Sequence, residues 1–288
     1  MIVISIFNHK GGVGKTLTSV NVAAALGSKF NKLVLLLDLD PQGNATSTFG
    51  INPDELEQEK SLAYAIYTQA VTMVYPDRVN ILQSPEEILK SCTIPIPRDN
   101  IYIAPGNHWL ANRPLHDMVR KHVSAIKELL SELPYEYVII DTKGNDDEMM
   151  DAAFYASDGV IIPTEPSRHS FDGIVQTIMT VSRFKQDYDT PLDVFGIVLN
   201  SKRGKPDKKE QEIFDGTRMY CEEEKIKVYK SIIPYSKMAA NSIWNSKSVI
   251  NYYRGNPAEV AFTNLTREII VDTEIIRGYK GERQQTNS

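Results

Sequence analysis

Short, continuous apolar runs recur along the chain. They lie at residues 2–7, 33–38, 137–141, 159–163, 194–200 and 230–234. Within a run, apolar and polar residues do not alternate, which is the pattern of a strand covered by helices on both faces. We therefore expect these runs to be strands of a buried, mostly parallel sheet.

Amphipathic stretches separate the runs, for example at residues 115–133, where apolar side chains recur near helical spacing. This order predicts the α/β class, with a doubly wound, mostly parallel sheet and helices on both faces. Residues 52–99 are rich in Tyr, Glu and Pro and are expected to form helices and loops. The length fits one domain over residues 1–277, followed by a polar tail, 278–288, that we expect to be disordered.

Composition sets limits on the class of protein. Hydrophobic residues make up 42% of the chain and charged residues 24%, so a folded globular protein with only local disorder is expected. No apolar stretch approaches the roughly 20 residues that a membrane-spanning helix needs. The N-terminus enters a strand directly, without a charged region and a cleavage site. We expect a soluble, cytoplasmic protein.

Charge and cysteine content exclude two further classes. The formal net charge of −5 argues against a protein that is basic throughout, such as a small nucleic-acid coat protein, but it allows a local basic face. Cys92 and Cys221 are far apart and form no CxxC motif, so we expect ordinary thiols in a reducing compartment and no metal or iron–sulfur site.

The loop after the first run carries a phosphate-binding motif. Its sequence, NHKGGVGKT, lacks the first glycine of the general GxxxxGK[ST] pattern because His9 occupies that position, but it fits the variant KGGxGK[ST], the deviant Walker A. Glycines let the backbone bring N–H groups close to phosphate oxygens, and the following helix directs its positive dipole end at the same anion. The alternative, a glycine turn that binds nothing, is rare for a motif this long.

Two side chains of this loop have chemical roles. Lys15 is expected to contact the β- and γ-phosphates, and Thr16 to supply a hydroxyl ligand for Mg²⁺. The signature lysine of the variant is Lys10. The expected nucleotide contacts are Gly11, Gly12, Val13, Gly14, Lys15, Thr16 and Leu17.

Three acidic residues that follow apolar runs form a second cluster. Asp38 and Asp40 lie at the carboxyl end of the second run, where strand alternation predicts that both side chains point to the same side. Asp141 ends the third run, as does a Walker B carboxylate that holds Mg²⁺ directly or through water. Open α/β sheets bind ligands at this edge, so Thr16, Asp38 and Asp141 are the expected metal ligands. Each acid taken alone also fits a helix cap.

Four segments together resemble the ParA branch of the ParA/MinD ATPases. They are NHKGGVGKT at 8–16, DLDPQGNAT at 38–46, YEYVIIDT at 135–142 and SDGVIIPTEPS at 157–167. The similarity runs from residue 1 to about residue 270 and is loose in the middle and in the C-terminal third. It implies a deviant Walker A P-loop fold, ATPase activity, and ATP and Mg²⁺ as cofactors.

The resemblance also implies roles for single residues. In this family two subunits close face to face around two ATP molecules, and the signature lysine, here Lys10, reaches the partner's phosphates, where a cation stabilises charge that develops during hydrolysis. Asp40 matches the residue that orients the attacking water, so Lys10, Lys15 and Asp40 are the expected catalytic residues. Asn200 matches the position that reads adenine, and the loop after Pro234 completes the base pocket.

The chain departs from the family pattern after the Walker B aspartate. The family usually has Thr-Pro-Pro there, whereas this chain has Thr142, Lys143, Gly144 and Asn145. A lysine so near the γ-phosphate either strengthens nucleotide binding, alters the environment of the attacking water, or is a solvated loop residue. No arginine that would stabilise the transition state is evident near the loop, so we expect a slow intrinsic rate.

A cluster of basic residues follows Asn200. Its members are Lys202, Arg203, Lys205, Lys208 and Lys209, and further cations are Lys225, Lys227, Lys230, Lys237, Lys247, Arg254 and Arg267. Members of the family bind non-specific DNA through C-terminal basic residues that form one surface in the ATP dimer, so the first five are the expected DNA contacts. The alternative is a solvated, charged surface.

Three related classes were weighed against this one. A MinD-like membrane ATPase needs a C-terminal amphipathic anchor, and the last residues, GYKGERQQTNS, have no apolar face, so no membrane contact is expected. An iron–sulfur reductase needs paired cysteines. A metabolic ATP-dependent ligase or amidase of the same fold remains open, and it would show substrate-dependent turnover without a response to DNA.

The resemblance therefore predicts a cytoplasmic, nucleoid-associated ATPase for the partition of a plasmid, a chromosome or another cargo. We expect a homodimer in the ATP state that binds non-specific DNA. Release is expected when a ParB-like or other cargo-bound activator stimulates hydrolysis. Because binding is directed at phosphates, it should weaken steeply with salt.

Overall fold

One mostly parallel sheet organises the computed structural model, which describes residues 1–77, 83–167, 170–237, 246–252 and 254–286. In these residues, eight strands follow the order β3-β4-β2-β5-β1-β6-β7-β8, and every neighbouring pair is parallel except β3 with β4. The strands are β1 (Ile2–Ile6), β2 (Val34–Asp38), β3 (Ile94–Ile96), β4 (Ile101–Ala104), β5 (Tyr137–Asp141), β6 (Gly159–Thr164), β7 (Asp193–Asn200) and β8 (Val228–Ile233). The predicted fold class is confirmed.

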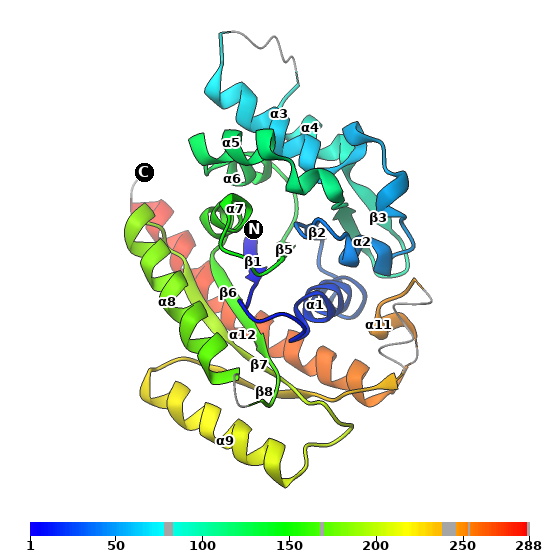
Figure 1. Ribbon diagram of the computed structural model, residues 1–288, viewed down its shortest axis with the longest axis vertical. Helices are drawn as coiled ribbons and strands as arrows, with labels where there is room; N and C mark the ends of the chain where they lie inside the picture. Colours follow the sequence, from blue (N-terminus) through cyan, green and yellow to red (C-terminus); the bar gives the residue numbers. More distant parts are fainter. Residues whose placement is uncertain (78–82, 168–169, 238–245, 253, 287–288) are drawn as a thin grey trace.

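Helices cover both faces of the sheet (Figure 1). Helices α1, α11 and α12 pack on one face, and α3 to α9 cover the other. Their bounds are α1 (Lys15–Phe30), α2 (Asn44–Thr48), α3 (Leu62–Val74), α4 (Pro85–Cys92), α5 (Arg113–Lys121), α6 (Ala125–Leu130), α7 (Glu148–Ala156), α8 (Ser170–Tyr188), α9 (Lys208–Glu223), α11 (Val249–Tyr252) and α12 (Pro257–Thr286). Short 3₁₀ turns lie at Pro53–Glu55, Gln58–Lys60 and His108–Ala111.

Strand alternation divides the buried side chains between two cores. In β1, the side chains of Ile2, Ile4 and Ile6 pack in the core formed with α1 and α12, whereas Val3 lies in the core beneath α3 to α7. Every residue of β1 is buried, so its side chains are apolar except for Ser5, whose hydroxyl forms a hydrogen bond with Ser157 Oγ at 2.8 Å. This is why the strand appears in the sequence as an apolar run interrupted only by Ser5.

Three features of the fold differ from what the sequence analysis predicts. Strand β4 is not among the predicted apolar runs. The segment 52–99 also contains β3, an edge strand that pairs antiparallel with β4. Its residues are half-buried or exposed, so no apolar run marks it. The stretch 115–133 forms two helices, because His122 leaves the helical conformation with a φ of −141° between the end of α5 and the start of α6.

Helix α12 runs to Thr286 and so includes most of the segment 278–288 that the sequence analysis separates as a tail. The domain boundary at residue 277 and the disorder of the tail stay predictions. Among the described helices, none combines the length and the apolar character that crossing a membrane requires.

Both cysteines are free and buried. Burial raises the pKa of the Cys92 thiol to about 12 and that of Cys221 to about 11. A thiol with so high a pKa has little thiolate at neutral pH, which suits the prediction of ordinary, unreactive cysteines.

We expect Gly27→Ala to destabilise the protein, although alanine in a helix is usually favoured over glycine by roughly 0.5–1 kcal/mol. Gly27 lies inside α1, where a Cβ would be 2.4 Å from the carbonyl oxygen of Asp99 and 2.6 Å from that of Asn100. Overpacking against backbone should lower the free energy of unfolding by about 1–3 kcal/mol, measured by urea denaturation.

The matched control is Gly216→Ala in α9, where nothing lies within 4 Å of the added Cβ. This change should stabilise the protein by roughly 0.5–1 kcal/mol because helix propensity then acts alone. If both variants were equally stabilised, the close approach of α1 to the turn at Asp99 would be wrong.

Candidate nucleotide site

The loop between β1 and α1 lies at the carboxyl edge of the sheet. Adjacent parallel strands place Ile6, Asp38 and Asp141 in register at this edge. Gly12 and Gly14 have φ values of 74° and 91°, a conformation that favours glycine. Gly14 has a second constraint, because a Cβ there would be 2.5 Å from the side-chain nitrogen of Asn200. The predicted motif therefore has the glycine-dependent shape of a phosphate-binding loop.

Lys15 reaches back across the loop. Its ammonium group donates to the carbonyl oxygens of Asn8 (3.0 Å) and Lys10 (3.1 Å), and the side chain is buried. Burial lowers the pKa of Lys15, while the charges of Asp141 and Asp40 act in the opposite direction. The structure thus holds a buried cation where the sequence predicts the β- and γ-phosphates.

Lys10 makes its contacts within its own chain. Its ammonium group donates to Ser167 Oγ at 2.5 Å, and its backbone N–H donates to Asn8 Oδ1 at 2.9 Å. Ser167 belongs to the segment between β6 and α8, so the signature lysine lies between the phosphate-binding loop and that segment. Its role across a dimer interface stays a prediction.

The Asp141 carboxylate is the centre of the acidic cluster. It is fully buried and accepts hydrogen bonds from Thr16 Oγ1 (2.8 Å) and Ser19 Oγ (2.7 Å) at the start of α1. Burial, and then the charge of Asp38 on the adjacent strand, raise the pKa of Asp141 to about 8. A cation placed beside this carboxylate would offset both effects.

Asp38 is also fully buried but is bonded mainly to its own loop. Its carboxylate accepts from the backbone N–H and the hydroxyl of Thr46 (2.8 and 2.6 Å) and from the N–H of Asp40 (3.2 Å). Burial raises its pKa to about 6. Thr46 Oγ1 in turn accepts from Gly106 N–H at 2.9 Å. Asp38 therefore fixes the loop that carries Asp40.

The oxygens of Thr16 and Asp141 fit a magnesium ion, which prefers hard oxygen ligands. Within the described residues, no three His, Cys, Asp or Glu side chains gather into a metal cage. Mg²⁺ at this position would therefore complete its coordination with phosphate oxygens and water, as it does in many nucleotide sites. The predicted ligands Thr16 and Asp141 are in contact, with Asp38 beside them on the next strand.

The position of Asp40 differs from the one inferred from strand alternation. Strand β2 ends at Asp38, so the alternation does not extend to Asp40. The Asp40 carboxylate instead closes a turn, accepting from Gln42 N–H (2.9 Å) and the side-chain amide of Asn44 (3.4 Å). It is half-buried, and its charge raises the pKa of Lys15. Asp40 thus lies near the predicted phosphate position on a turn instead of a strand.

A cavity of about 200 Å³ lies beside the phosphate-binding loop. It brings together the predicted nucleotide contact Leu17 and the predicted base contacts Asn200 and Pro234, and its lining also includes Glu165 and Tyr235. The Asn200 side-chain nitrogen donates to the Val13 carbonyl oxygen at 2.7 Å. Asn200 Oδ1 is buried without a hydrogen-bond partner among the described residues, so an acceptor beside the cavity remains for a ligand donor.

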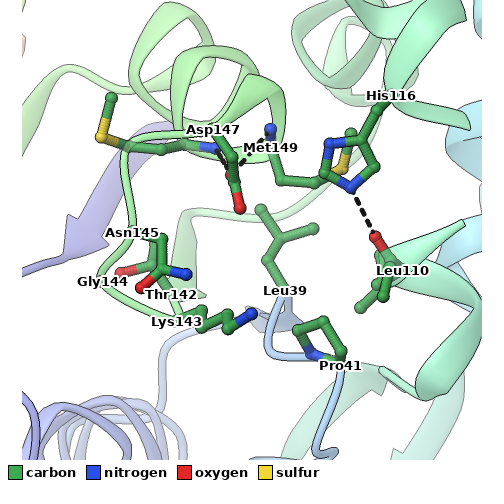
Figure 2. A pocket seen from close by; sticks show the side chains of 12 residues that line it. Leu39, Pro41, Leu110, His116, Thr142, Lys143, Gly144, Asn145, Asp147 and Met149 are labelled. Carbon is green, nitrogen blue, oxygen red and sulfur yellow. Dashed lines mark hydrogen bonds between the residues drawn. The ribbon is translucent and has the colours of Figure 1, made fainter. Parts of the chain in front are cut away.

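A second cavity, also of about 200 Å³, lies between the turn at Asp40 and the segment after β5. Leu39, Pro41, Leu110 and Met149 supply apolar walls (Figure 2). Lys143 extends along this cavity toward Pro41. The departure from the family pattern therefore faces the turn that carries Asp40.

The basic cluster is exposed but only partly unpaired. Lys202 forms an ion pair with Glu165 (3.1 Å), and Arg203 pairs with Asp207 (3.0 Å). For Lys205, Lys208 and Lys209, no ion pair is found within the described residues. Lys208 and Lys209 begin α9. These three lysines are therefore the members that are most available to a polyanion.

Several residues of the site were missed in the sequence. Ser19 lies three residues after Thr16, a helical spacing that places both hydroxyls on one face, so this signal was present. Asn8 supplies both a carbonyl for Lys15 and a side-chain acceptor for Lys10 N–H. Thr46 and Glu165 had no local signal, because their partners Asp38 and Lys202 are brought near only by folding.

The sequence matches a family model and several known proteins over most of its length. A family model described as an AAA domain matches residues 1–194. The sporulation initiation inhibitor protein Soj of Bacillus subtilis is 29% identical, with 93% of this chain and 97% of Soj covered. The chromosome partitioning protein ParA of Caulobacter vibrioides is 27% identical, with 93% of each chain covered.

Solved structures agree on the fold. An ATP complex of Cyanothece McdA superposes with a TM-score of 0.76 at 17% identity, covering 94% of this chain and 96% of McdA. Cobyrinic acid a,c-diamide synthase from Mycobacterium smegmatis, with bound ADP and magnesium, superposes with a TM-score of 0.72 at 21% identity, covering 94% of each chain. At these identities the likeness shows a shared fold and no shared substrate.

We expect Asp141→Asn to stabilise the nucleotide-free protein at pH 8 more than at pH 5. Because the pKa of Asp141 is about 8 when folded and near 4 when unfolded, the folded state binds the proton more tightly, and stability falls as pH rises between these values. The asparagine variant has no carboxyl group to ionise at this position, so it does not lose stability in this way as the pH rises. Thermal unfolding at both pH values, without Mg²⁺, measures the difference.

The control is Asp54→Asn, which changes an exposed acid and should alter the unfolding temperature equally at both pH values. A difference between parent and Asp141→Asn that does not widen with rising pH would show that the buried acid is not protonated as described.

Proposed function

The chain belongs to the AAA domain family and, through its Soj and ParA relatives, to the ParA/MinD-type ATPases, and from this premise we propose that it dimerises on ATP, binds DNA and is released by stimulated hydrolysis. The observation that carries the proposal is the complete deviant Walker A loop with Lys10 beside it. Lys15, Thr16 and Asp141 meet at one edge of the sheet.

ATP and Mg²⁺ are the cofactors that this site suits. Lys15 would hold the β- and γ-phosphates, and Thr16 with Asp141 would hold the metal, which supplies positive charge to the phosphates when bound. The Asp40 carboxylate accepts a hydrogen bond from the attacking water and orients it. In the base cavity, Asn200 Oδ1 is an acceptor without a hydrogen-bond partner among the described residues, and it matches the amino group of adenine.

Dimerisation follows from the charge of the paired nucleotides. Two polyphosphates that face each other repel, and Lys10 on each subunit supplies a cation that reduces this repulsion. In a single chain Lys10 donates to Ser167, so it must leave that hydroxyl to cross the interface. Hydrolysis removes the terminal phosphate. Because Lys10 then loses part of the negative charge that it contacts across the interface, the dimer dissociates.

DNA binding is assigned to the exposed cations of the basic cluster. Lys205, Lys208 and Lys209 supply phosphate contacts without first breaking an ion pair to any residue in the described part of the chain. Such contacts carry no base specificity, which suits a protein that moves over DNA in the cytoplasm. A ParB-like or other cargo-bound activator would end binding by stimulating hydrolysis.

We expect Asp40→Ala to trap the ATP-bound dimer, because water is no longer oriented while the nucleotide contacts remain. Lys10→Ala should bind ATP yet stay monomeric, since it lacks the cation that joins the subunits. Light scattering after size exclusion, with saturating Mg-ATP, measures both states, and Asp54→Ala is the control for loss of an exposed acid. A dimeric Lys10→Ala protein, or a monomeric Asp40→Ala protein with ATP bound, would contradict the proposed interface.

Combined replacement of Lys205, Lys208 and Lys209 by alanine should weaken DNA binding by the Asp40→Ala dimer and reduce its salt slope by about 5, because the dimer carries two copies of each lysine and about 0.9 counterion is released per phosphate contact. Replacement of the paired residues Lys202 and Arg203 is the matched comparison. It should weaken DNA binding less for each charge that is removed. Fluorescence anisotropy on labelled duplex DNA, from low to moderate salt, measures both slopes.

An unchanged slope in the triple variant would place the DNA contacts elsewhere. Steady ATP turnover by the parent protein that DNA does not affect, but that a small-molecule acceptor increases, would favour the metabolic ligase or amidase class instead.

A further inference from the structure

The segment after β5 is fixed at both ends. Thr142 Oγ1 donates to the carbonyl oxygen of Ile6 at 2.7 Å, and Asp147 caps α7 by accepting from two backbone N–H groups at 3.0 and 3.1 Å. Between them, Asp146 lies 3.4 Å from His9 Nδ1 of the phosphate-binding loop. The backbone position of Lys143 therefore follows from contacts to β1, to α7 and to that loop.

Gly144 sets the distance between this segment and Lys15. Its φ of 90° is a conformation that proline cannot adopt, so the segment does not follow the backbone of Thr-Pro-Pro. A Cβ on Gly144 would be 2.6 Å from the Lys15 ammonium nitrogen and 2.6 Å from the Asn8 carbonyl oxygen. The Cα of Gly144 is thus within about 4–5 Å of the group assigned to the terminal phosphates, and Lys143 is the next residue.

The Lys143 side chain is exposed and has no hydrogen bond or ion pair to any residue that the structure describes. This distinguishes it from Lys15, whose ammonium group donates to a loop carbonyl oxygen, and from Lys10, whose ammonium group donates to Ser167. Lys143 lines the cavity with Leu39 and Pro41, the two neighbours of Asp40, and Figure 2 shows it extending toward them. Its flexible stem spans roughly 6 Å, enough to reach a phosphate held by Lys15.

We propose that Lys143 places a second cation on the terminal phosphate from within the same chain, opposite Asp40, and so supplies charge stabilisation that an activator would otherwise have to bring. The proposal rests on the ATPase function proposed above and changes its regulation. Negative charge on the phosphoryl oxygens and the leaving oxygen is what a cation stabilises in this reaction. A slow intrinsic rate is expected from the sequence because no arginine is evident near the loop. With Lys143 in this role, intrinsic hydrolysis should be faster than that expectation, and the stimulation by an activator should be smaller.

The reaction is water attack on the γ-phosphorus, in which the bond to the β,γ-bridging oxygen breaks and ADP leaves with that electron pair. Asp40 orients the water, and the proton leaves with inorganic phosphate or solvent. Lys143 forms no covalent bond during the reaction. Its contribution is electrostatic, so it should affect the transition state more than ATP binding.

Single-turnover hydrolysis without DNA or activator tests this role. Lys143→Ala should slow the step about tenfold or more, while Lys143→Arg, which keeps the charge, should stay within about threefold of the parent. The dissociation constant for a non-hydrolysed ATP analogue, measured by calorimetry, should change less than about threefold. Lys60→Ala, which removes another exposed lysine, is the matched control and should leave the rate unchanged.

Chemical rescue tests whether the amine itself is needed. If Lys143 had only a structural role, restoring an amine at this position would not restore the hydrolysis rate. Both native cysteines are buried, so Lys143→Cys offers a single accessible thiol for 2-bromoethylamine among the described residues. Alkylation, which forms a thioether and releases bromide, restores an amine at the position of the lysine amine. The rate should recover at least about fivefold after alkylation.

An Lys143→Ala rate within twofold of the parent, an equal loss of rate and of analogue binding, or failed rescue would each overturn the inference. Lys15→Ala distinguishes a wrong role for Lys143 from failure of the proposed ATPase function. If Lys15→Ala abolishes turnover while Lys143→Ala does not, only the role of Lys143 is wrong. If Lys15→Ala hydrolyses ATP normally, the nucleotide site itself is misassigned, and the inference falls with it.

Discussion

The buried Asp141 carboxylate holds together the parts on which the rest of the site depends. It ends β5 at the centre of the sheet and accepts hydroxyl hydrogen bonds from Thr16 and Ser19, so it fixes the start of α1 against the strand edge. Because Asp38 is buried in register beside it, the protein holds two acids where ionisation is costly. This arrangement suits a site completed by a cation.

Near this acidic centre, three lysines have different surroundings. Lys15 is buried and bonded to loop carbonyls, Lys10 lies against Ser167, and Lys143 is exposed at the cavity beside Asp40. A single loop residue, Gly144, permits the last of these positions by approaching Lys15 without a side chain. The departure from the family pattern at Lys143 and Gly144 therefore adds an exposed cation near the turn that carries Asp40.

The base cavity and the basic cluster are physically connected. Glu165 lines the cavity and pairs with Lys202, while Tyr235 lines the same cavity and donates its backbone N–H to the Arg203 carbonyl oxygen at 2.8 Å. The Lys202 side chain is thus paired with a residue that lines the cavity, whereas Arg203 is joined to the cavity only through its backbone. Lys208 and Lys209 lie farther along the chain, at the start of α9.

The sequence by itself determined six of the eight described strands and the phosphate-binding loop, but not β3 and β4. Strands such as β1 and β5 are buried on both faces, which leaves a mainly apolar run, and the loop needs glycines and Lys15 at fixed local spacing. Only the tertiary structure decided the bonding of Asp38 to Thr46, the approach of Gly144 to Lys15 and the pairing of Glu165 with Lys202. These contacts join segments that are distant along the chain or that meet across a turn. Because no local pattern is needed to form them, none is left in the sequence to predict them.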